Sequence, residues 1–307
     1  MRTRAPGGTP SRPEQAVTER KTLMSKTFLV TGVSTGLGLA IARRALAAGH
    51  RVAGTVRTER HAAAFQSLDA ERARAFILDL TDSDRIEPTV RAAEAALGPI
   101  EVLVANAGYG VEGTFEESPM ADLRRQFEVN VFGTVATMKA VLPGMRERRA
   151  GHIFVITSMG GMTTFPGLSF YEGSKHAMEG ITEGLAQEVA QFGVRVTAVA
   201  PGAFATDWAG RSLARAPRGV PDYDELFDPI RARRQALAGQ GIGDPDRAGR
   251  AILTVLDADT PPVHLLLGSD ALRLVTAGRR RVQNDIDTWT DLSLSTDRPD
   301  GGVTVSS

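Results

Sequence analysis

Short apolar runs rich in β-branched residues alternate with longer amphipathic stretches from Lys26 onward, and this alternation restricts the fold more than any other feature. Most runs lack a polar alternation, which is typical of parallel strands buried on both faces. Strands are expected at Thr27–Thr31, Arg51–Val56, Ala75–Leu78, Ile100–Ala105, His152–Thr157, Val194–Val199 and Val263–Leu267. Helices are expected between them, among others at Leu39–Ala48, Ile86–Leu97, Ala121–Glu147 and Glu172–Gln191. The pattern predicts an α/β fold with a doubly wound parallel sheet.

The pattern also sets the expected domain limits. Residues 1–24 are polar, basic and rich in Pro and Gly, and we expect a disordered N-terminal extension there, with Met24 as an alternative start. Residues 25–292 form one predicted domain. It includes a long Pro-, Gly- and Arg-rich insertion from Gly210 to Gly243, and insertions of this length are usually functional or mobile. Residues 293–307 are expected to form a flexible tail.

Composition excludes several function classes. Lys+Arg and Asp+Glu are both 36, so the chain lacks the basic footprint of a nucleic-acid-binding protein. The absence of cysteine excludes disulfides and thiol nucleophiles, and it fits a reducing, cytoplasmic location. No apolar run reaches about 18 residues, so no membrane span is expected. His152, His176 and His264 lack partners at metal-ligand spacing, so no metal site is predicted.

A glycine-rich turn joins the first expected strand to a helix. Glycines at 32, 36 and 38 in the segment 31–38 (TGVSTGLG) allow a tight turn and a close backbone approach to a ligand. The N-terminus of the helix that follows offers free N–H groups and a positive dipole end. A strand, this turn and a helix together predict a site for a dinucleotide pyrophosphate, although an ordinary βα turn has the same residues.

The residues after the second expected strand bear on the choice of cofactor. An acidic residue there binds a free ribose 2′-hydroxyl, whereas a basic residue suits a 2′-phosphate. Here Arg57 follows the strand directly, which favours NADP(H) over NAD(H). Asp79, after the third strand, is placed either to contact adenine or to cap the turn that follows it.

A tyrosine and a lysine stand four residues apart at Tyr171 and Lys175, which places both on one face of a helix. The chain has three tyrosines and only four lysines, so chance predicts about 0.04 such pairs. Ser158 precedes Tyr171 by thirteen residues and follows the fifth expected strand. Requiring this serine as well lowers the chance expectation by roughly another factor of ten to twenty.

At these positions the chain resembles the short-chain dehydrogenases/reductases, a family with a Rossmann fold. The resemblance is carried by the segment 31–38 and by Asp79, Asn106, Ala107, Gly108, Asn130, Ser158, Tyr171, Lys175, Pro201, Gly202 and Thr206. The TGxxxGxG spacing is typical of the shorter-subunit type. The resemblance implies that residues about 207–243 form a substrate lid.

The resemblance also implies a role for each catalytic residue. Tyr171 would act as general acid in reduction and general base in oxidation. Lys175 would lower the pKa of Tyr171 and hold the nicotinamide ribose. Ser158 would hydrogen-bond the substrate oxygen, and Asn130 would bind a water that links Lys175 to solvent. The segment 201–206 would orient the nicotinamide ring.

Two sets of binding residues follow. Those expected to bind the cofactor are Thr31, Gly32, Ser34, Thr35, Gly36, Leu37, Gly38, Arg57, Asp79, Leu80, Asn106, Ala107, Gly108, Tyr171, Lys175, Pro201, Gly202, Phe204 and Thr206. Those expected to contact the substrate are Ser158, Met159, Phe165, Tyr171 and Trp208, with Met162, Phe170, Phe204, Tyr223 and Phe227 as further candidates for the pocket wall. These side chains predict a mainly apolar pocket.

The expected function is hydride transfer between NADP(H) and a hydrophobic ketone, aldehyde or secondary alcohol. Thr35 stands where many NADP-dependent members of the family carry Lys or Arg, so an NAD-dependent alcohol dehydrogenase is an alternative. A catalytically silent, cofactor-binding regulatory protein is a third possibility. The partners expected are a small-molecule substrate and further copies of the chain, in a homodimer or homotetramer.

Overall fold

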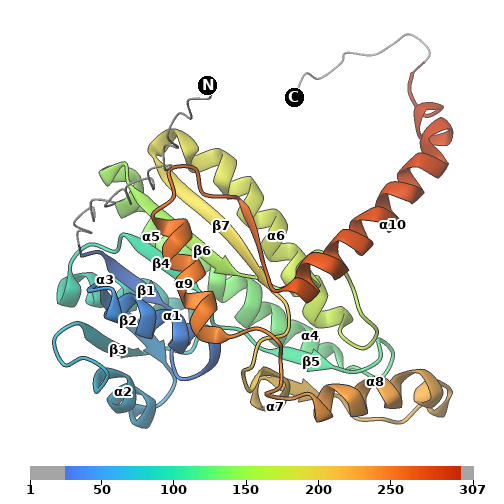
Figure 1. The fold of residues 1–307 in the computed structure, drawn as a ribbon, viewed down its shortest axis with the longest axis horizontal. Coiled ribbons are helices and arrows are strands. Elements are labelled where there is room, and N and C mark those ends of the chain that lie inside the picture. The colour runs from blue at the N-terminus through green and yellow to red at the C-terminus, as the bar shows by residue number, and fades with distance from the viewer. Residues whose placement is uncertain (1–24, 299–307) are drawn as a thin grey trace, which may run out of the picture.

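A seven-stranded parallel sheet forms the centre of the computed structural model, which describes residues 25–298 (Figure 1). The strand order is β3-β2-β1-β4-β6-β7-β9. The strands are β1 (Thr27–Val30), β2 (Arg51–Val56), β3 (Ala73–Ile77), β4 (Val102–Ala105), β6 (Gly151–Ile156), β7 (Val194–Pro201) and β9 (His264–Leu267). The chain reverses its direction of winding between β1 and β4, and ligands bind at such switch points in open α/β sheets.

Helices cover both faces of the sheet. They are α1 (Gly36–Ala47), α2 (Glu59–Gln66), α3 (Ser83–Leu97), α4 (Met120–Phe127), α5 (Thr134–Arg148), α6 (Ser169–Val189) and α9 (Pro245–Leu256). One core lies between the sheet and α1, α2 and α9, and the other lies between the sheet and α3, α5 and α6. The doubly wound fold predicted from the sequence is therefore confirmed.

Successive residues of the central strands point into opposite cores. Phe28 and Val30 of β1 face the α1 side, while Leu29 faces the α3 side, and all three are buried. Strands covered on both faces need apolar residues at every position, which explains why the sequence shows continuous apolar runs.

The seven strands lie where the sequence predicts them, with small shifts at their ends. One expected helix, Ala121–Glu147, is interrupted, whereas the helix expected to end at Leu97 does end there. A π-helical turn, Glu128–Gly133, separates α4 from α5, and Gly98 at positive φ ends α3. The expected N-terminal extension lies outside the described residues, as does the tail beyond residue 298.

The segment 207–243, called the insertion below, folds against one edge of the molecule. It contains α7 (Trp208–Arg211), β8 (Leu213–Arg215) and α8 (Asp224–Ala236). Strand β8 pairs in parallel with β5 (Gly110–Glu112), which follows β4 closely in the chain. This second sheet fixes the start of the insertion beside the carboxyl ends of the main strands.

The chain ends in a long helix, α10 (Ser269–Leu294), which points away from the body (Figure 1). It reaches two residues into the segment expected to be a tail. Within residues 25–298, no helix combines the length and the apolar character needed to cross a membrane.

Candidate active site

A cavity of about 810 Å³ opens at the carboxyl ends of the parallel strands, between the glycine-rich turn and the insertion. Both ends of the predicted site contribute to it. Gly36 and Arg57 line one part, and Ser158, Tyr171 and Lys175 line another. The structure therefore brings the expected cofactor turn and the expected catalytic residues into one continuous space.

The glycine turn is shaped as its residues require. Gly32 and Gly36 have positive φ values of 74° and 63°, which glycine adopts without strain. A Cβ on Gly38 would lie 2.4 Å from both Asn106 Nδ2 and Gly32 O, so only glycine fits there. The Asn106 amide donates to the carbonyl oxygens of Thr31 and Gly32, at 2.8 and 3.2 Å. These contacts fix the turn against the end of β4.

The N-terminus of α1 is suited to an anion. Thr35 precedes the helix but its side chain caps no backbone N–H, and the first turn holds no acidic residue. Elsewhere in the fold, Thr58 and Asp244 cap the helices that follow them. The first N–H groups of α1 therefore remain available to a phosphate.

Arg57 and Asp79 both line the cavity, at the ends of neighbouring strands β2 and β3. The Asp79 Oδ1 accepts hydrogen bonds from the Thr81 backbone N–H and hydroxyl, at 3.0 and 2.9 Å. The backbone bond is the main cause that lowers the Asp79 pKa, and the charge of Arg57 adds to it. Asp79 therefore acts as the cap of this turn while it also faces the cavity.

The catalytic candidates come from two elements. Ser158 follows β6, and its hydroxyl accepts a hydrogen bond from the Gly160 N–H at 3.0 Å. Tyr171 and Lys175 lie one turn apart on α6, both buried, with the Lys175 Nζ 5.8 Å from the centre of the Tyr171 ring. The Lys175 ammonium donates to the Ile156 carbonyl oxygen at 2.9 Å, which ties α6 to the end of β6.

The charge states differ from the expectation that Lys175 lowers the Tyr171 pKa. Burial raises the Tyr171 pKa to about 12, and a hydrogen bond to Ser158 offsets this only in part. Burial also lowers the Lys175 pKa to about 8, although the nearby Glu179 carboxylate acts in the opposite direction. The expected lowering is not found in this structure, because desolvation is the largest cause of both pKa shifts.

Asn130 lies in the π-helical turn, behind the cavity wall. Its Oδ1 accepts from the Tyr109 N–H at 3.1 Å, and its amide donates to Tyr109 O and Ser174 Oγ. A Cβ at Gly108 would be 3.0 Å from Asn130 Oδ1 and 3.6 Å from Lys175 Nζ, so the two groups converge behind this glycine. Asn130 is thus beside Lys175 but does not line the cavity.

The expected substrate contacts are placed together around Tyr171. Met159, Phe165 and Trp208 line the cavity, and the Trp208 ring lies 5.0 Å from the Tyr171 ring. Phe204 lines it too. Four further candidates for the pocket wall do not line the cavity. Phe170 packs on Phe115, Tyr223 bonds to Glu116 at the surface, Phe227 lies under Gly167, and Met162 faces elsewhere.

Most residues expected to bind the cofactor line the cavity. The exceptions are Gly38, described above, and Thr31, whose hydroxyl accepts from the Asn106 and Ala107 N–H groups. Thr31 and Gly38 instead pack the glycine turn against the residues after β4. The sequence reading missed other lining residues, namely Tyr109, Arg125, Val129, Glu172, Ile230, Arg233, Arg234 and Leu237. The helical spacing of the last four was visible in the sequence, but the side to which they point was not.

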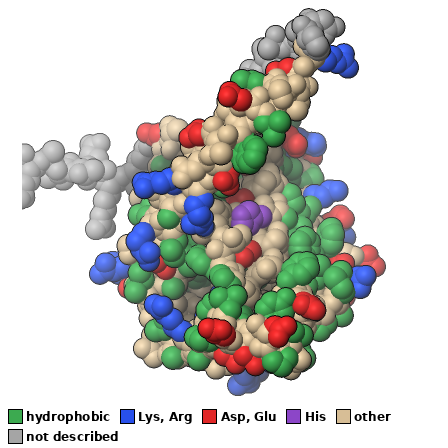
Figure 2. Space-filling view, turned by 90° about the vertical axis from the view of Figure 1, so that its right-hand side faces the viewer, with side chains coloured by type: hydrophobic (Ala, Val, Ile, Leu, Met, Phe, Trp, Pro, Cys, Tyr) green, Lys and Arg blue, Asp and Glu red, His purple; other side chains and the backbone are tan. Residues whose placement is uncertain are grey.

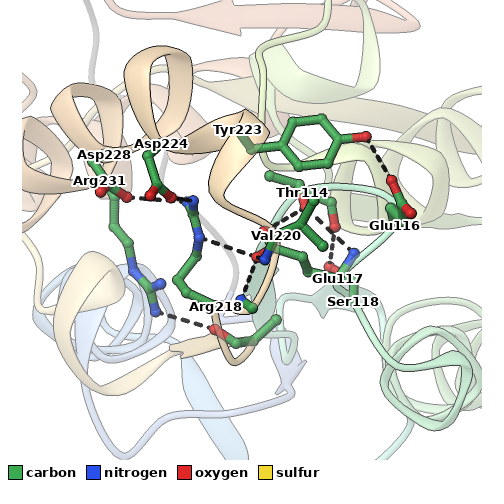
Figure 3. Close-up of polar contacts among 12 residues, drawn as sticks. Thr114, Glu116, Glu117, Ser118, Arg218, Val220, Tyr223, Asp224, Asp228 and Arg231 are labelled. Atoms are coloured by element: carbon green, nitrogen blue, oxygen red, sulfur yellow. Dashed lines mark hydrogen bonds and ion pairs between the residues drawn. The ribbon is translucent and has the colours of Figure 1, made fainter.

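Two buried carboxylates attach the insertion to the body. Glu112, on β5, is fully buried and lies between Arg215, Arg231 and Arg234, with the closest contacts at 3.0 and 3.1 Å. Glu117 accepts hydrogen bonds from the Gly219 and Val220 N–H groups, and Arg218 pairs with it at 3.3 Å (Figure 3). These charged contacts therefore add to the β5–β8 pairing and to the buried Leu213 and Phe227 in attaching the wall of the cavity.

Comparison with known proteins agrees with this geometry. A family model described as short chain dehydrogenase matches residues 26–216. Oxidoreductase BOA17 of Botryotinia fuckeliana is 35% identical over 273 residues, which cover 89% of this chain and 99% of that protein.

Two solved structures share the fold. A short-chain dehydrogenase from Streptomyces avermitilis is 39% identical with a TM-score of 0.84, covering 90% of this chain and 100% of that chain. An alcohol dehydrogenase from the archaeon Thermococcus sibiricus, complexed with 5-hydroxy-NADP, is 25% identical with a TM-score of 0.65, covering 80% and 96%. The sheet, the glycine turn and these matches lead to one conclusion: the chain belongs to the short-chain dehydrogenase family of oxidoreductases.

Proposed function

We propose that the protein transfers a hydride between NADP(H) and a hydrophobic ketone, aldehyde or secondary alcohol, with Tyr171 as the general acid and base. The observation that carries this proposal is the meeting of Ser158, Tyr171 and Lys175 in the cavity that also contains the glycine turn. A catalytically silent protein has no need of all three.

The cavity has the features that a dinucleotide needs. The uncapped N-terminus of α1 would take the pyrophosphate, and Gly32 lets the backbone approach it. Lys175 would hold the nicotinamide ribose, and the backbone around Gly202 with the Thr206 hydroxyl would hold the carboxamide. The nicotinamide, when bound, supplies or accepts the hydride, while the protein positions both reactants.

The charge state of Tyr171 supports the reductive direction. With a pKa of about 12, the phenol stays protonated at neutral pH, which is the state that a general acid requires. The Lys175 ammonium beside it stabilises the phenolate left after proton transfer. Asn130 would bind a water that returns a proton to Lys175 from solvent.

Ser158 would bind the substrate oxygen. Its Oγ accepts from the Gly160 N–H, so its own proton is the group that it would donate to the substrate oxygen. A donor aimed at a carbonyl oxygen stabilises the negative charge that develops as the hydride arrives.

The insertion would serve as the substrate lid. Trp208 covers Tyr171, and Met159, Phe165 and Leu168 continue the apolar wall. An apolar wall beside Tyr171 favours substrates in which the reacting carbonyl or hydroxyl is attached to a hydrophobic body, although Arg233 and Arg234 of the insertion also line the cavity. The cysteine-free composition supports a cytoplasmic location.

Replacing Tyr171 tests the catalytic proposal. Tyr171→Phe keeps the ring and removes the proton donor, so we expect kcat to fall about 10²–10⁴-fold on a panel of ketones and alcohols, with cofactor affinity retained. Tyr223→Phe, at the surface, is the matched control and should leave kcat unchanged. Unchanged turnover in Tyr171→Phe would refute the proposed role.

Cofactor choice is tested at Arg57. Support for NADP(H) comes from this cation at the end of β2 and from the NADP analogue in the Thermococcus sibiricus structure. Arg57→Ala is expected to lower the ratio of NADPH to NADH affinity about tenfold in a fluorescence titration. Arg60→Ala, on an arginine that does not line the cavity, is the control. An unchanged ratio in Arg57→Ala would favour NAD(H).

A further inference from the structure

Helix α10 has two unlike halves. In its first half, Ala271 and Val275 are buried against the body, and Gly278 packs on Thr163. Beyond Gly278 the helix leaves the body and continues to Leu294 (Figure 1). The large apolar side chains of this outer half are exposed: 59% for Val282, 55% for Ile286 and 59% for Trp289.

These exposed side chains continue the packed face. Positions 271, 275, 278, 282, 286 and 289 follow one another at intervals of three or four, so they form one stripe along the helix. Hydrophobic side chains stand out on the projecting helix in Figure 2. In proteins, most of the stability of a helix comes from packing of its apolar face. The outer stripe therefore has the character of a contact surface.

Charge is divided along the same helix. Arg279, Arg280 and Arg281 lie where it leaves the body, while Asp285, Asp287 and Asp291 lie in the outer half. Within residues 25–298 none of these six forms an ion pair. Of these, Arg281 and Asp285 flank the stripe, while Arg280, Asp287 and Asp291 lie on the opposite face of the helix. A second copy of α10 running antiparallel sets Arg281 of each helix near Asp285 of the partner subunit. A parallel copy sets like charges together.

We propose that α10 is an interface with a second copy of this chain, packed antiparallel about a two-fold axis. In this arrangement Val282 lies opposite Ile286 of the partner subunit. Arg281 and Asp285 flank the stripe on one edge, so Arg281 meets Asp285 of the partner subunit, and the symmetry repeats each contact.

The choice of a second copy rests on this self-complementary charge. An anionic membrane suits the outer half poorly, since Asp285 would lie beside the lipid phosphates and the helix carries no basic residue beyond Arg281. The stripe is small beside the roughly 1,200–2,000 Å² that stable interfaces bury, so we expect dissociation in the micromolar range when α10 acts alone.

Cross-linking tests the geometry directly, because the chain has no cysteine of its own. Full-length Val282→Cys and Ile286→Cys are mixed and oxidised. We expect the mixed disulfide to form at least several times faster than either variant links to itself. Asn284→Cys, on the opposite face of the helix, is the control for random collision. Mixed linking no faster than the Asn284→Cys control overturns the proposal, and so does faster self-linking of Val282→Cys, which indicates a parallel pair.

Exchanging the charges of Arg281 and Asp285 tests whether the partner is a second copy of this chain. In sedimentation equilibrium, Arg281→Asp and Asp285→Arg are each expected to weaken association about tenfold, since each pair occurs twice, and the double variant should restore it. Failure of the double variant to restore association overturns the proposed contact. Binding of the full chain to phosphatidylcholine vesicles, lost in Trp289→Ser, would assign the stripe to a membrane and also overturn it.

Discussion

The body of the sheet and the insertion hold together by different means. In the body, strands such as β1 and β4 bury every side chain in apolar cores. In the insertion, Leu213 and Phe227 are buried too, but two buried carboxylates, Glu112 and Glu117, add contacts with arginine and backbone partners. Apolar burial is proportional to area and insensitive to salt, whereas ion pairs depend on desolvation, geometry and ionic strength.

The difference matters because the cavity lies between the two regions. The half that would hold the cofactor is built on rigid strand ends. The half that would cover the substrate is attached to the body partly through a few charged contacts. Such an arrangement lets the cover open without disturbing the cofactor site. It follows that substitutions in the two halves should differ in their salt dependence and in which kinetic constant they change.

The largest effect is expected at Glu112. Glu112→Gln leaves Arg215, Arg231 and Arg234 without their carboxylate, and removing one partner of a buried ion cluster costs about 3 kcal/mol or more. We expect limited proteolysis within the insertion to accelerate about a hundredfold and KM to rise. The exposed Glu188→Gln is the control. Unaltered cleavage would show that charge does not hold the insertion.

The matching test of the body is Gly38→Ala. The new Cβ meets Gly32 O and the Asn106 amide at 2.4 Å, so we expect a loss of about 2 kcal/mol in unfolding free energy, with weaker cofactor binding. The loss should be equal at low and high salt in urea denaturation. Gly184→Ala, on α6 with no atom within 4 Å of its Cβ, should instead be neutral or stabilising. A salt-dependent loss would contradict the contrast.

Glu172 lies where the two regions meet. Its Oε1 accepts from the Phe165 N–H at 2.7 Å, and burial raises its pKa to about 7, while Arg234 of the insertion lowers it. The folded state therefore holds this proton between about pH 4.5 and 7, where the unfolded state has lost it. Unfolding free energy should fall as pH rises through this window, by about 1–2 kcal/mol. Glu172→Gln should remove this share of the slope. An unchanged slope would mean that other groups cause it.

The smallest effect is expected at Asp224. This exposed carboxylate pairs with Arg218, which also contacts Glu117 and Asp228 (Figure 3). Asp224→Asn should change unfolding free energy by less than about 0.5 kcal/mol, as exposed pairs generally do. Thermal unfolding measures it. A loss comparable to that of Glu112→Gln would show that exposed pairs also hold the insertion.

The two regions also differ in how well the sequence predicts them. The strands and the glycine turn are predicted from local sequence patterns, and they lie where expected. A strand buried on both faces has apolar residues at nearly every position, which the sequence shows directly. The insertion has no continuous apolar run of this kind. Glu112 reads as an ordinary surface residue until β5 pairs with β8, and Phe227 reads as a pocket wall until α8 packs it under Gly167.

Charge states were the least predictable part of the site. The spacing of Tyr171 and Lys175 correctly places both on α6, but their pKa values depend on how deeply each is buried, which spacing does not reveal. Glu172 is a similar case, since its position next to Tyr171 gives no sign that its carboxyl group turns inward to the Phe165 loop.

The pairing of β5 with β8 has a consequence for how the chain folds. Gly110 meets Leu213 only after about a hundred intervening residues are ordered. Closing so long a loop is slow and costs entropy before any contact compensates it. During synthesis the glycine turn and the first four strands of the sheet emerge well before β8 does. The cofactor half can therefore be in place while the wall over Tyr171 is still unfolded, so the enclosed site is among the last features that the folding chain acquires.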